Sequence, residues 1–297
     1  MERSPARRAR AVLSATGTAV LLLLAPARAA AVTTASRWDV TVAVHITGGT
    51  GAPMHVRLAL PADTEAQQIG ALEVAARGLE ATVVRDPLQP YVEVRGELNG
   101  ARRIAVRYAV YRTRELLPVP AVQPVLAPPP ELVAFLSPSP LFQSRSILVR
   151  DFLESHVSPL LGTAGNTDLM RAIFQVTRER LTWDRAGKTL TLDVLRSGKG
   201  KRIGIERVFT TCLRCAHIPA RLVEGMNLNS TTRRKRVFWT EVWAQNRWWP
   251  VSASRGWVGR EPQSYVALTR DGQRVLAVYG PVTATYSVQS VPAETKT

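Results

Sequence analysis

The stretch VFTTCLRCAHIPARLVEGM, residues 208–226, decides how this 297-residue chain is organised. Its first half completes a helical pattern of apolar side chains that begins near residue 203. Pro219 ends that pattern, because proline has no N–H to donate and keeps the preceding residue out of the helical region. From residue 220 the apolar side chains alternate, as they do in a strand. This passage from helix to strand predicts helices packed against a sheet.

Strands continue downstream of this stretch. VFWTEVW, residues 237–243, and RWWPVSAS, residues 247–254, are rich in the aromatic and β-branched side chains that strands favour. YVALTRDGQRVLAVYG, residues 265–280, predicts a final hairpin, because Asp271-Gly272 is a strong signal for a two-residue turn.

Helices precede these strands. Residues 146–157 and 167–181 are amphipathic, and in the second segment Leu169, Ile173 and Val176 share one face. Helices followed by an antiparallel sheet predict an α+β domain over residues 141–297.

The first half of the chain follows a different pattern. Between residues 38 and 112 the apolar period is two, and Gly, Pro, Asp and Asn separate six alternating runs. This pattern predicts an N-terminal antiparallel β-sandwich over residues 30–115. Residues 116–140 hold eight prolines and predict a stiff, extended linker rather than another element.

Residues 1–29 have the pattern of a signal peptide. A start rich in arginine precedes an apolar run over residues 11–25, and small residues then occupy the −3 and −1 positions of a cleavage site. The run is short for a membrane-spanning helix. We therefore expect a periplasmic or secreted protein of a bacterial cell envelope, held at a membrane only if the leader stays uncleaved.

The composition is that of a globular protein. Hydrophobic residues make up 45% of the chain and charged residues 21%, which excludes disorder and fibrous repeats. Two cysteines are too few for a disulfide framework, so the core must form by apolar burial. The formal net charge is +16. Residues 199–236 alone carry ten basic and two acidic side chains, which favours either an anion site or a solvated basic loop.

Three of these stretches together resemble transglutaminase-like domains, which have a papain-like α+β fold. Ile218-Pro219-Ala220-Arg221 resembles the Gly-Ile-Pro-Ala-Arg run that ends the family's helix. VFWTEVW resembles the strand with the family's His-Ala-Trp-x-Glu pattern, and RWWPVSAS resembles the next strand, where Trp-x-x-Val-Asp carries an aspartate. The order and spacing agree over residues 140–258.

The family's chemistry needs a thiolate at a helix N-terminus, a histidine that takes the thiol proton and an aspartate that orients the histidine. On this sequence the cysteine position falls on Arg202, the histidine position on Val237 and the aspartate position on Ser252. A guanidinium cannot attack a carbonyl, and valine cannot accept a proton. The resemblance therefore implies a catalytically degenerate domain with no catalytic residues, no metal and no cofactor.

A narrower resemblance points to the inactive transglutaminase-like domains of bacteria. It depends on the basic run at residues 233–236 before VFWTEV and on the ending ATYSVQSV. Those domains are exported, are usually fused to seven transmembrane helices and are associated with ATP-grasp peptide ligases. The seven helices do not occur in this sequence, which ends at Thr297.

Cys212 and Cys215 form a CxxC near the end of the predicted helix. We interpret them as buried small hydrophobes, with a disulfide or a catalytic role as the alternatives. Cys212 lies ten residues, about 15 Å, beyond Arg202 along the helix, which is too far to reach the same cleft. The four histidines, His45, His55, His156 and His217, show no metal-ligand spacing, and His217 is expected to form a helix cap or turn.

We predict that the old active-site groove binds an anionic group. The candidate groove residues are Arg202, Trp239, Glu241, Trp249, Arg233 and Arg234. The function expected is that of an exported pseudoenzyme that binds a peptide or an envelope protein, anionic ones included, as a binding or scaffold module. The alternative is a thiol-dependent acyltransferase, cysteine peptidase or amidase with relocated catalytic residues. A nucleic-acid partner is not expected, since the chain has an export signal and no basic-aromatic recognition motif.

Overall fold

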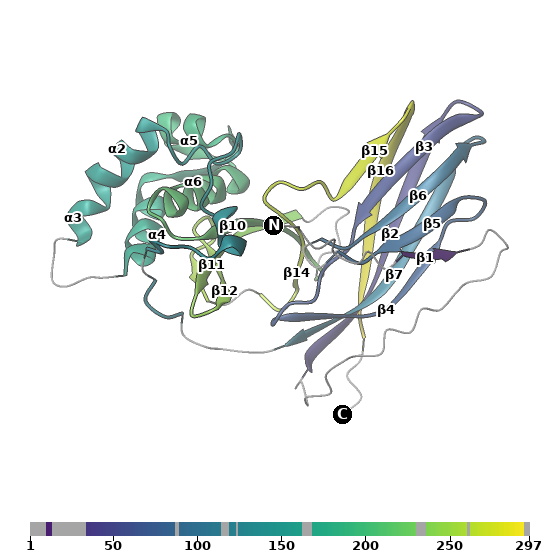
Figure 1. The fold of residues 1–297 in the computed structure, drawn as a ribbon, viewed down its shortest axis with the longest axis horizontal. Helices are drawn as coiled ribbons and strands as arrows, with labels where there is room; N and C mark the ends of the chain where they lie inside the picture. Colours follow the sequence, from purple (N-terminus) through teal and green to yellow (C-terminus); the bar gives the residue numbers. More distant parts are fainter. Residues whose placement is uncertain are drawn as a thin grey trace, which may run out of the picture.

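The computed structural model describes residues 10–13, 34–86, 89–113, 119–122, 124–161, 168–229, 236–259 and 262–293. The described chain is mostly β with some helices, which gather at one end of the molecule (Figure 1). Except for residues 10–13, the predicted signal peptide lies outside the described residues.

The strands of the first half of the chain lie in antiparallel sheets. One sheet has the order β1 (Arg10–Leu13), β5 (Glu80–Val84), β6 (Tyr91–Leu98), β3 (Ala52–Ala59), β15 (Leu276–Tyr279). A second sheet has the order β16 (Val282–Ala293), β2 (Thr34–Gly48), β7 (Arg102–Thr113), β4 (Gln67–Ala75). Side chains of both sheets, such as Val56 of β3 and Val106 of β7, meet in one hydrophobic core. The alternation of buried and exposed residues along these strands is the period of two found in the sequence.

Two strands from the end of the chain complete these sheets. β15 pairs with β3, and β16 runs along most of β2, from Val282 opposite Gly48 to Ala293 opposite Arg37 (Figure 1). The strands of the predicted N-terminal sandwich therefore share their sheets with two C-terminal strands. A β-sandwich of residues 30–115 that forms a separate domain stays a prediction.

The hairpin predicted over residues 265–280 is wrong. Asp271 and Gly272 do adopt the positive φ values of a turn, 50° and 81°. The strands on either side then diverge, because β14 (Tyr265–Arg270) pairs with β10 (Ala220–Asn227) while β15 pairs with β3. Val275, after the turn, is buried in the core of the N-terminal sheets, which explains why the chain crosses over.

The second half of the chain packs helices on another antiparallel sheet. Its strand order is β13 (Trp257–Val258), β12 (Arg247–Ser252), β11 (Arg236–Ala244), β10, β14. The helices predicted over 146–157, 167–181 and 203–216 are confirmed as α2 (Ile147–His156), α4 (Leu169–Arg180) and α6 (Arg202–Cys215). α3 (Ser158–Leu161), α5 (Thr191–Ser197) and the short parallel pair β8 (Thr182–Lys188) and β9 (Lys199–Gly200) complete this half.

α6 is the central helix of this half. Ile205, Val208, Phe209 and Cys212 follow helical spacing and are buried against strand residues such as Val242. The helix ends where predicted, because His217 takes a left-handed conformation, with φ 56°, just before Pro219. Its turn role is therefore confirmed.

The proline-rich segment is more than an extended linker. It contains a short helix, α1 (Pro130–Val133), and Val119 and Val122 are buried in the core of the helical half. Phe135 accepts a backbone hydrogen bond from Ala220 at the start of β10. The segment is therefore packed onto the domain that follows it.

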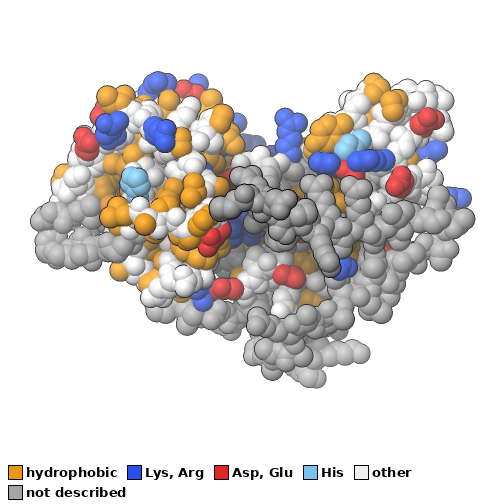
Figure 2. Space-filling model, in the orientation of Figure 1, with side chains coloured by type: hydrophobic (Ala, Val, Ile, Leu, Met, Phe, Trp, Pro, Cys, Tyr) orange, Lys and Arg blue, Asp and Glu red, His pale blue; other side chains and the backbone are white. Residues whose placement is uncertain are grey.

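Apolar side chains also reach the surface of the helical half (Figure 2). Ile147 of α2 is 69% exposed and Leu190, before α5, is 52% exposed. None of the helices within the described ranges has both the length and the hydropathy needed to cross a membrane.

Gly225 of β10 gives a direct test of this packing. It lies opposite Val237, and a Cβ added there would come within 2.4 Å of the Val266 carbonyl oxygen and 2.6 Å of the Trp239 ring. We expect Gly225→Ala to lower the free energy of unfolding by about 1–3 kcal/mol, because neither a strand carbonyl nor a buried indole can move aside. The control is Gly49→Ala, where nothing lies within 4 Å. Equal stability of both variants in urea unfolding would contradict the packing described.

Candidate functional site

Arg202 begins α6 and is anchored to the chain that follows β12. Its Nη1 donates a hydrogen bond of 2.7 Å to the carbonyl oxygen of Ser254. The guanidinium carbon lies 4.9 Å from the centre of the Trp183 ring. Burial lowers the pKa of Arg202, and the nearby positive charge of Arg255 lowers it further. The first residue of the helix is therefore a cation fixed between a carbonyl and an aromatic face.

Glu206, one turn along α6, is a fully buried carboxyl group. Its Oε1 accepts hydrogen bonds from Ser252 Oγ at 2.6 Å and from the Ser254 backbone N–H at 2.9 Å. Its Oε2 accepts a third from Thr240 Oγ1 at 3.2 Å. Burial raises the pKa of Glu206, and the three donors oppose that rise. This carboxyl group joins the helix to β11 and to the end of β12.

Val237 and Trp239 lie on the face of β11 opposite to Thr240. Both are buried with Tyr265 and Ala267 of β14 in a small apolar cluster. The Trp239 and Tyr265 ring centres are 6.1 Å apart, and the Arg255 guanidinium lies 5.5 Å from the Tyr265 ring.

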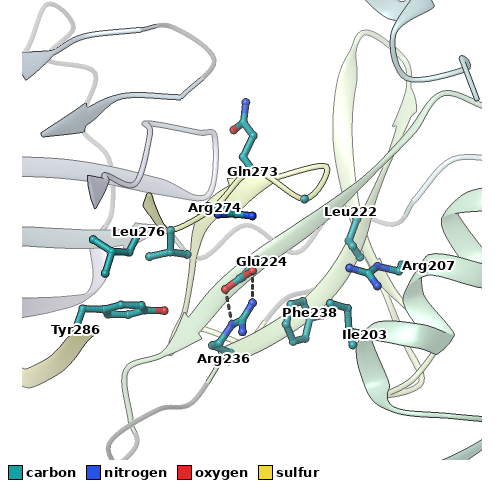
Figure 3. Close-up of a pocket in the computed structure, with 12 residues that line it drawn as sticks. Ile203, Arg207, Leu222, Glu224, Arg236, Phe238, Gln273, Arg274, Leu276 and Tyr286 are labelled. Atoms are coloured by element: carbon teal, nitrogen blue, oxygen red, sulfur yellow. Dashed lines mark hydrogen bonds and ion pairs between the residues drawn. The ribbon is translucent and has the colours of Figure 1, made fainter. Parts of the chain in front are cut away.

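A cavity of about 260 Å³ lies beside the start of α6, on the helix side of the sheet (Figure 3). It is lined by residues of that helix, of β10 and β11, of the turn after β14, and of β15 and β16. Arg236 makes two hydrogen bonds to the carboxylate of Glu224, at 2.5 and 2.6 Å. Arg207 and Arg274 reach the same cavity from α6 and from the turn. The described lining residues thus carry three guanidinium groups and one carboxylate, an excess that favours an anion.

Arg207 has a buried donor that is left unsatisfied. Its Nη1 donates to the Thr189 carbonyl at 2.9 Å, but its buried Nε has no hydrogen-bond partner among the described residues. Burial lowers the pKa of Arg207, and the neighbouring charge of Arg236 lowers it further. An anion in the cavity would relieve this repulsion between like charges.

Comparison with known proteins agrees with this arrangement of helix and strands. Residues 159–253 match the model of the transglutaminase-like superfamily. This segment is a transglutaminase-like domain. No curated protein matches the chain.

One solved structure adds a likeness of fold, and a second is reported beside it. A proposed cysteine protease from Cytophaga hutchinsonii is 16% identical, with a TM-score of 0.65, and the match covers 88% of this chain and 92% of that chain. The periplasmic domain of TgpA from Pseudomonas aeruginosa is 14% identical, with a TM-score of 0.34, and the match covers 69% of this chain and 88% of that chain.

In the transglutaminase-like domain, two of the three positions predicted to be degenerate belong to one hydrogen-bond network. Arg202 and Ser252 are connected through Ser254 and Glu206, whereas Val237 lies in the apolar cluster on the opposite face of β11. Sequence reasoning missed Glu206, which it counted only as a charge within the basic segment. The sequence did contain a signal, since Glu206 lies three residues before Phe209 and so borders the apolar face of the helix.

The other candidate groove residues do not share one surface. Trp239 is fully buried, and Trp249 is buried in the helical core with its Nε1 donating to the Ala244 carbonyl at 2.9 Å. Glu241 faces a different cavity. Arg233 and Arg234 lie outside the described residues, so a groove that includes them stays a prediction.

Both cysteines are free thiols. Cys212 is fully buried in the helical core, as the buried-hydrophobe interpretation predicts, and burial raises its pKa well above the usual value. Burial also raises the pKa of Cys215, which is partly exposed. Within the described ranges, no three His, Cys, Asp or Glu side chains are placed to hold a metal ion.

The raised pKa of Glu206 predicts a pH-dependent stability. The folded protein holds this proton more tightly than the unfolded chain, whose value is near 4.5. Proton binding by Glu206 therefore stabilises the fold fully below that pH, and this stabilisation is lost as pH rises through the pKa of the folded state. Each unit of difference between the folded and unfolded pKa values corresponds to about 1.4 kcal/mol in the free energy of unfolding. Glu206→Gln stays neutral and should gain stability relative to the wild type between pH 4.5 and pH 8 in urea unfolding. A difference between the two proteins that does not change with pH would contradict the burial of this group.

Proposed function

We propose that this chain is an exported transglutaminase-like pseudoenzyme that binds a peptide or an envelope protein as a binding or scaffold module. The observation that carries the proposal is the state of Arg202 at the start of α6. The resemblance puts the family's nucleophile at this position, and here its side chain is a guanidinium bonded to the Ser254 carbonyl. A thiolate there would have been activated by the helix dipole, whereas a guanidinium is no nucleophile.

The remaining thiols give this proposal further support. Cys212 lies ten residues along the helix from Arg202, and its raised pKa keeps it protonated at neutral pH. The carboxyl group of the site comes from the helix, at Glu206, and Ser252 at the former aspartate position only donates to it. The buried, protonated thiol of Cys212, the carboxyl group on the helix at Glu206 and the serine at position 252 together favour binding over acyl transfer.

The cavity of Figure 3 suggests that the partner is anionic. Arg207, Arg236 and Arg274 line it, and the basic residues 233–235 directly precede Arg236 in the sequence. An acidic segment of a peptide or protein would complement this charge. Export rests on the predicted leader of residues 1–29. The sheets of the N-terminal half, which include β15 and β16, would carry the degenerate domain.

An acidic peptide tests the anionic partner. We expect a fluorescent decaglutamate peptide to bind the whole chain, and Arg207→Gln or Arg274→Gln to weaken that binding about threefold to tenfold, with a smaller salt dependence in each variant. Arg103→Gln is the matched control, because Arg103 is an exposed arginine on β7. An equal loss in the control, or binding that salt leaves unchanged, would contradict a site at this cavity.

A thiol assay tests the absence of catalysis. The whole chain is assayed for acyl transfer and for peptide hydrolysis before and after treatment with iodoacetamide. We expect no turnover that alkylation abolishes. Turnover that disappears on alkylation would overturn the proposal and favour an acyltransferase or peptidase with relocated residues.

A further inference from the structure

A larger cavity, of about 570 Å³, lies on the opposite face of the same sheet from α6. Neighbouring residues of β11 point to opposite faces, so Thr240 bonds to Glu206 on the helix side while Glu241 lines this cavity. The segment of residues 62–66, between β3 and β4, closes the cavity from the N-terminal half. Its volume is within the range of small-molecule sites.

The floor of this cavity is a buried ionic cluster. Arg221 Nε donates to Glu241 Oε2 at 2.6 Å, and Arg270 Nε approaches the same oxygen at 3.4 Å. These three side chains are only 10–12% exposed. Burial acts to raise the pKa of Glu241, but the two arginines outweigh it and hold the pKa below its usual value. Two guanidinium groups therefore share one carboxylate oxygen.

The neighbouring carboxylates have cationic partners of their own. Asp271 is bonded to Arg214 at 2.9 Å, and it also acts on Arg221. The described residues that line the cavity carry four guanidinium groups and four carboxylates: Arg112, Arg221, Arg247 and Arg270 against Asp63, Glu65, Glu241 and Asp271. Asp271 is paired with Arg214 and Glu65 with Arg247, so Arg221 and Arg270 have Glu241 to share. A ligand carboxylate would give these two guanidinium groups a second acceptor.

The wall of the cavity is aromatic. Phe135 and Trp248 meet edge to face with ring centres 4.9 Å apart, and Trp243 and Trp248 do so at 5.2 Å. The Arg221 guanidinium lies 4.0 Å from the centre of the Trp248 ring, so the aromatic wall and the ionic floor meet at this residue.

We propose that this cavity binds an apolar acid, with the ligand's carboxylate on Arg270 and Arg221 and its apolar body against Phe135, Trp243 and Trp248. Two kinds of ligand combine a carboxylate with an apolar body: a free arylalkanoic acid, and a peptide whose C-terminal residue has an apolar side chain. This site and the cavity beside α6 lie on opposite faces of the sheet, because Glu241 and Phe238 point to opposite faces of β11, and of their described lining residues the two share Gln273 alone.

Titration calorimetry on the whole chain tests the carboxylate. We expect 3-phenylpropionate to bind at least tenfold more tightly than 3-phenylpropionamide, which has the same shape without the charge. A tripeptide ending in phenylalanine, compared as the free acid and as the amide, distinguishes the peptide source from the free acid. Equal affinity of acid and amide in both pairs, or no saturable binding of either acid, overturns the proposal.

Two variants locate the binding. Arg270→Gln should weaken the acid at least tenfold, and Arg103→Gln, the exposed control, should leave it unchanged. Ala134 is exposed at the cavity, so Ala134→Trp should block it without disturbing the ionic floor, while Ala134→Ser keeps it open. Loss of binding in both Arg270→Gln and Ala134→Trp supports the site. Undiminished binding in Ala134→Trp overturns it, even if Arg270→Gln fails to fold.

Discussion

The buried carboxyl group of Glu206 is the interaction on which the geometry of the helical half depends. A carboxyl group removed from water must find hydrogen-bond donors, and here they come from Thr240 of β11, Ser252 of β12 and the backbone of Ser254. These donors fix the height and rotation of α6 on the sheet. The same contact places Arg202 against the Ser254 carbonyl. The chemistry at the start of the helix therefore follows from one buried acid.

The alternation of β11 then divides the domain into two sides. Phe238 and Thr240 face the helix and the smaller cavity, while Trp239 and Glu241 face the apolar cluster and the larger cavity. Gln273, in the turn after β14, lines both cavities. Two sites can therefore exist on the two faces of one sheet, since apart from Gln273 their described lining residues differ.

Local pattern predicted much of this fold. The helical period located α2, α4 and α6, and the run around Pro219 located the passage from α6 to β10. The partners of β15 and β16 could not be predicted in this way, because Asp271-Gly272 predicts a turn but not which strand the chain joins afterwards. That choice depends on burying Val275 and its neighbours in a core formed by residues far away in the sequence. The short parallel pair β8 and β9 was missed because two or three paired residues leave no periodic pattern.

The site was predictable to a similar degree. The motif spacing located the helix and the two strands that carry Arg202, Val237 and Ser252, and two of these residues, Arg202 and Ser252, belong to one hydrogen-bond network. It could not show that Trp239 and Trp249 are buried, since a strand that is covered on both faces exposes neither set of side chains. Nor could it show that Glu206 supplies the carboxyl group, which depends on the rotation of α6 about its own axis.

The most direct test of this account is the titration of Glu206 itself, followed by carbon-13 NMR of the side-chain carboxyl groups and assigned by loss of the resonance in Glu206→Gln. We expect this carboxyl group to titrate with a midpoint above its ordinary value near 4.5, since burial favours the protonated form. A midpoint at or below 4.5 would show that the group is open to water or matched by a cation, and would contradict the buried network at the start of α6.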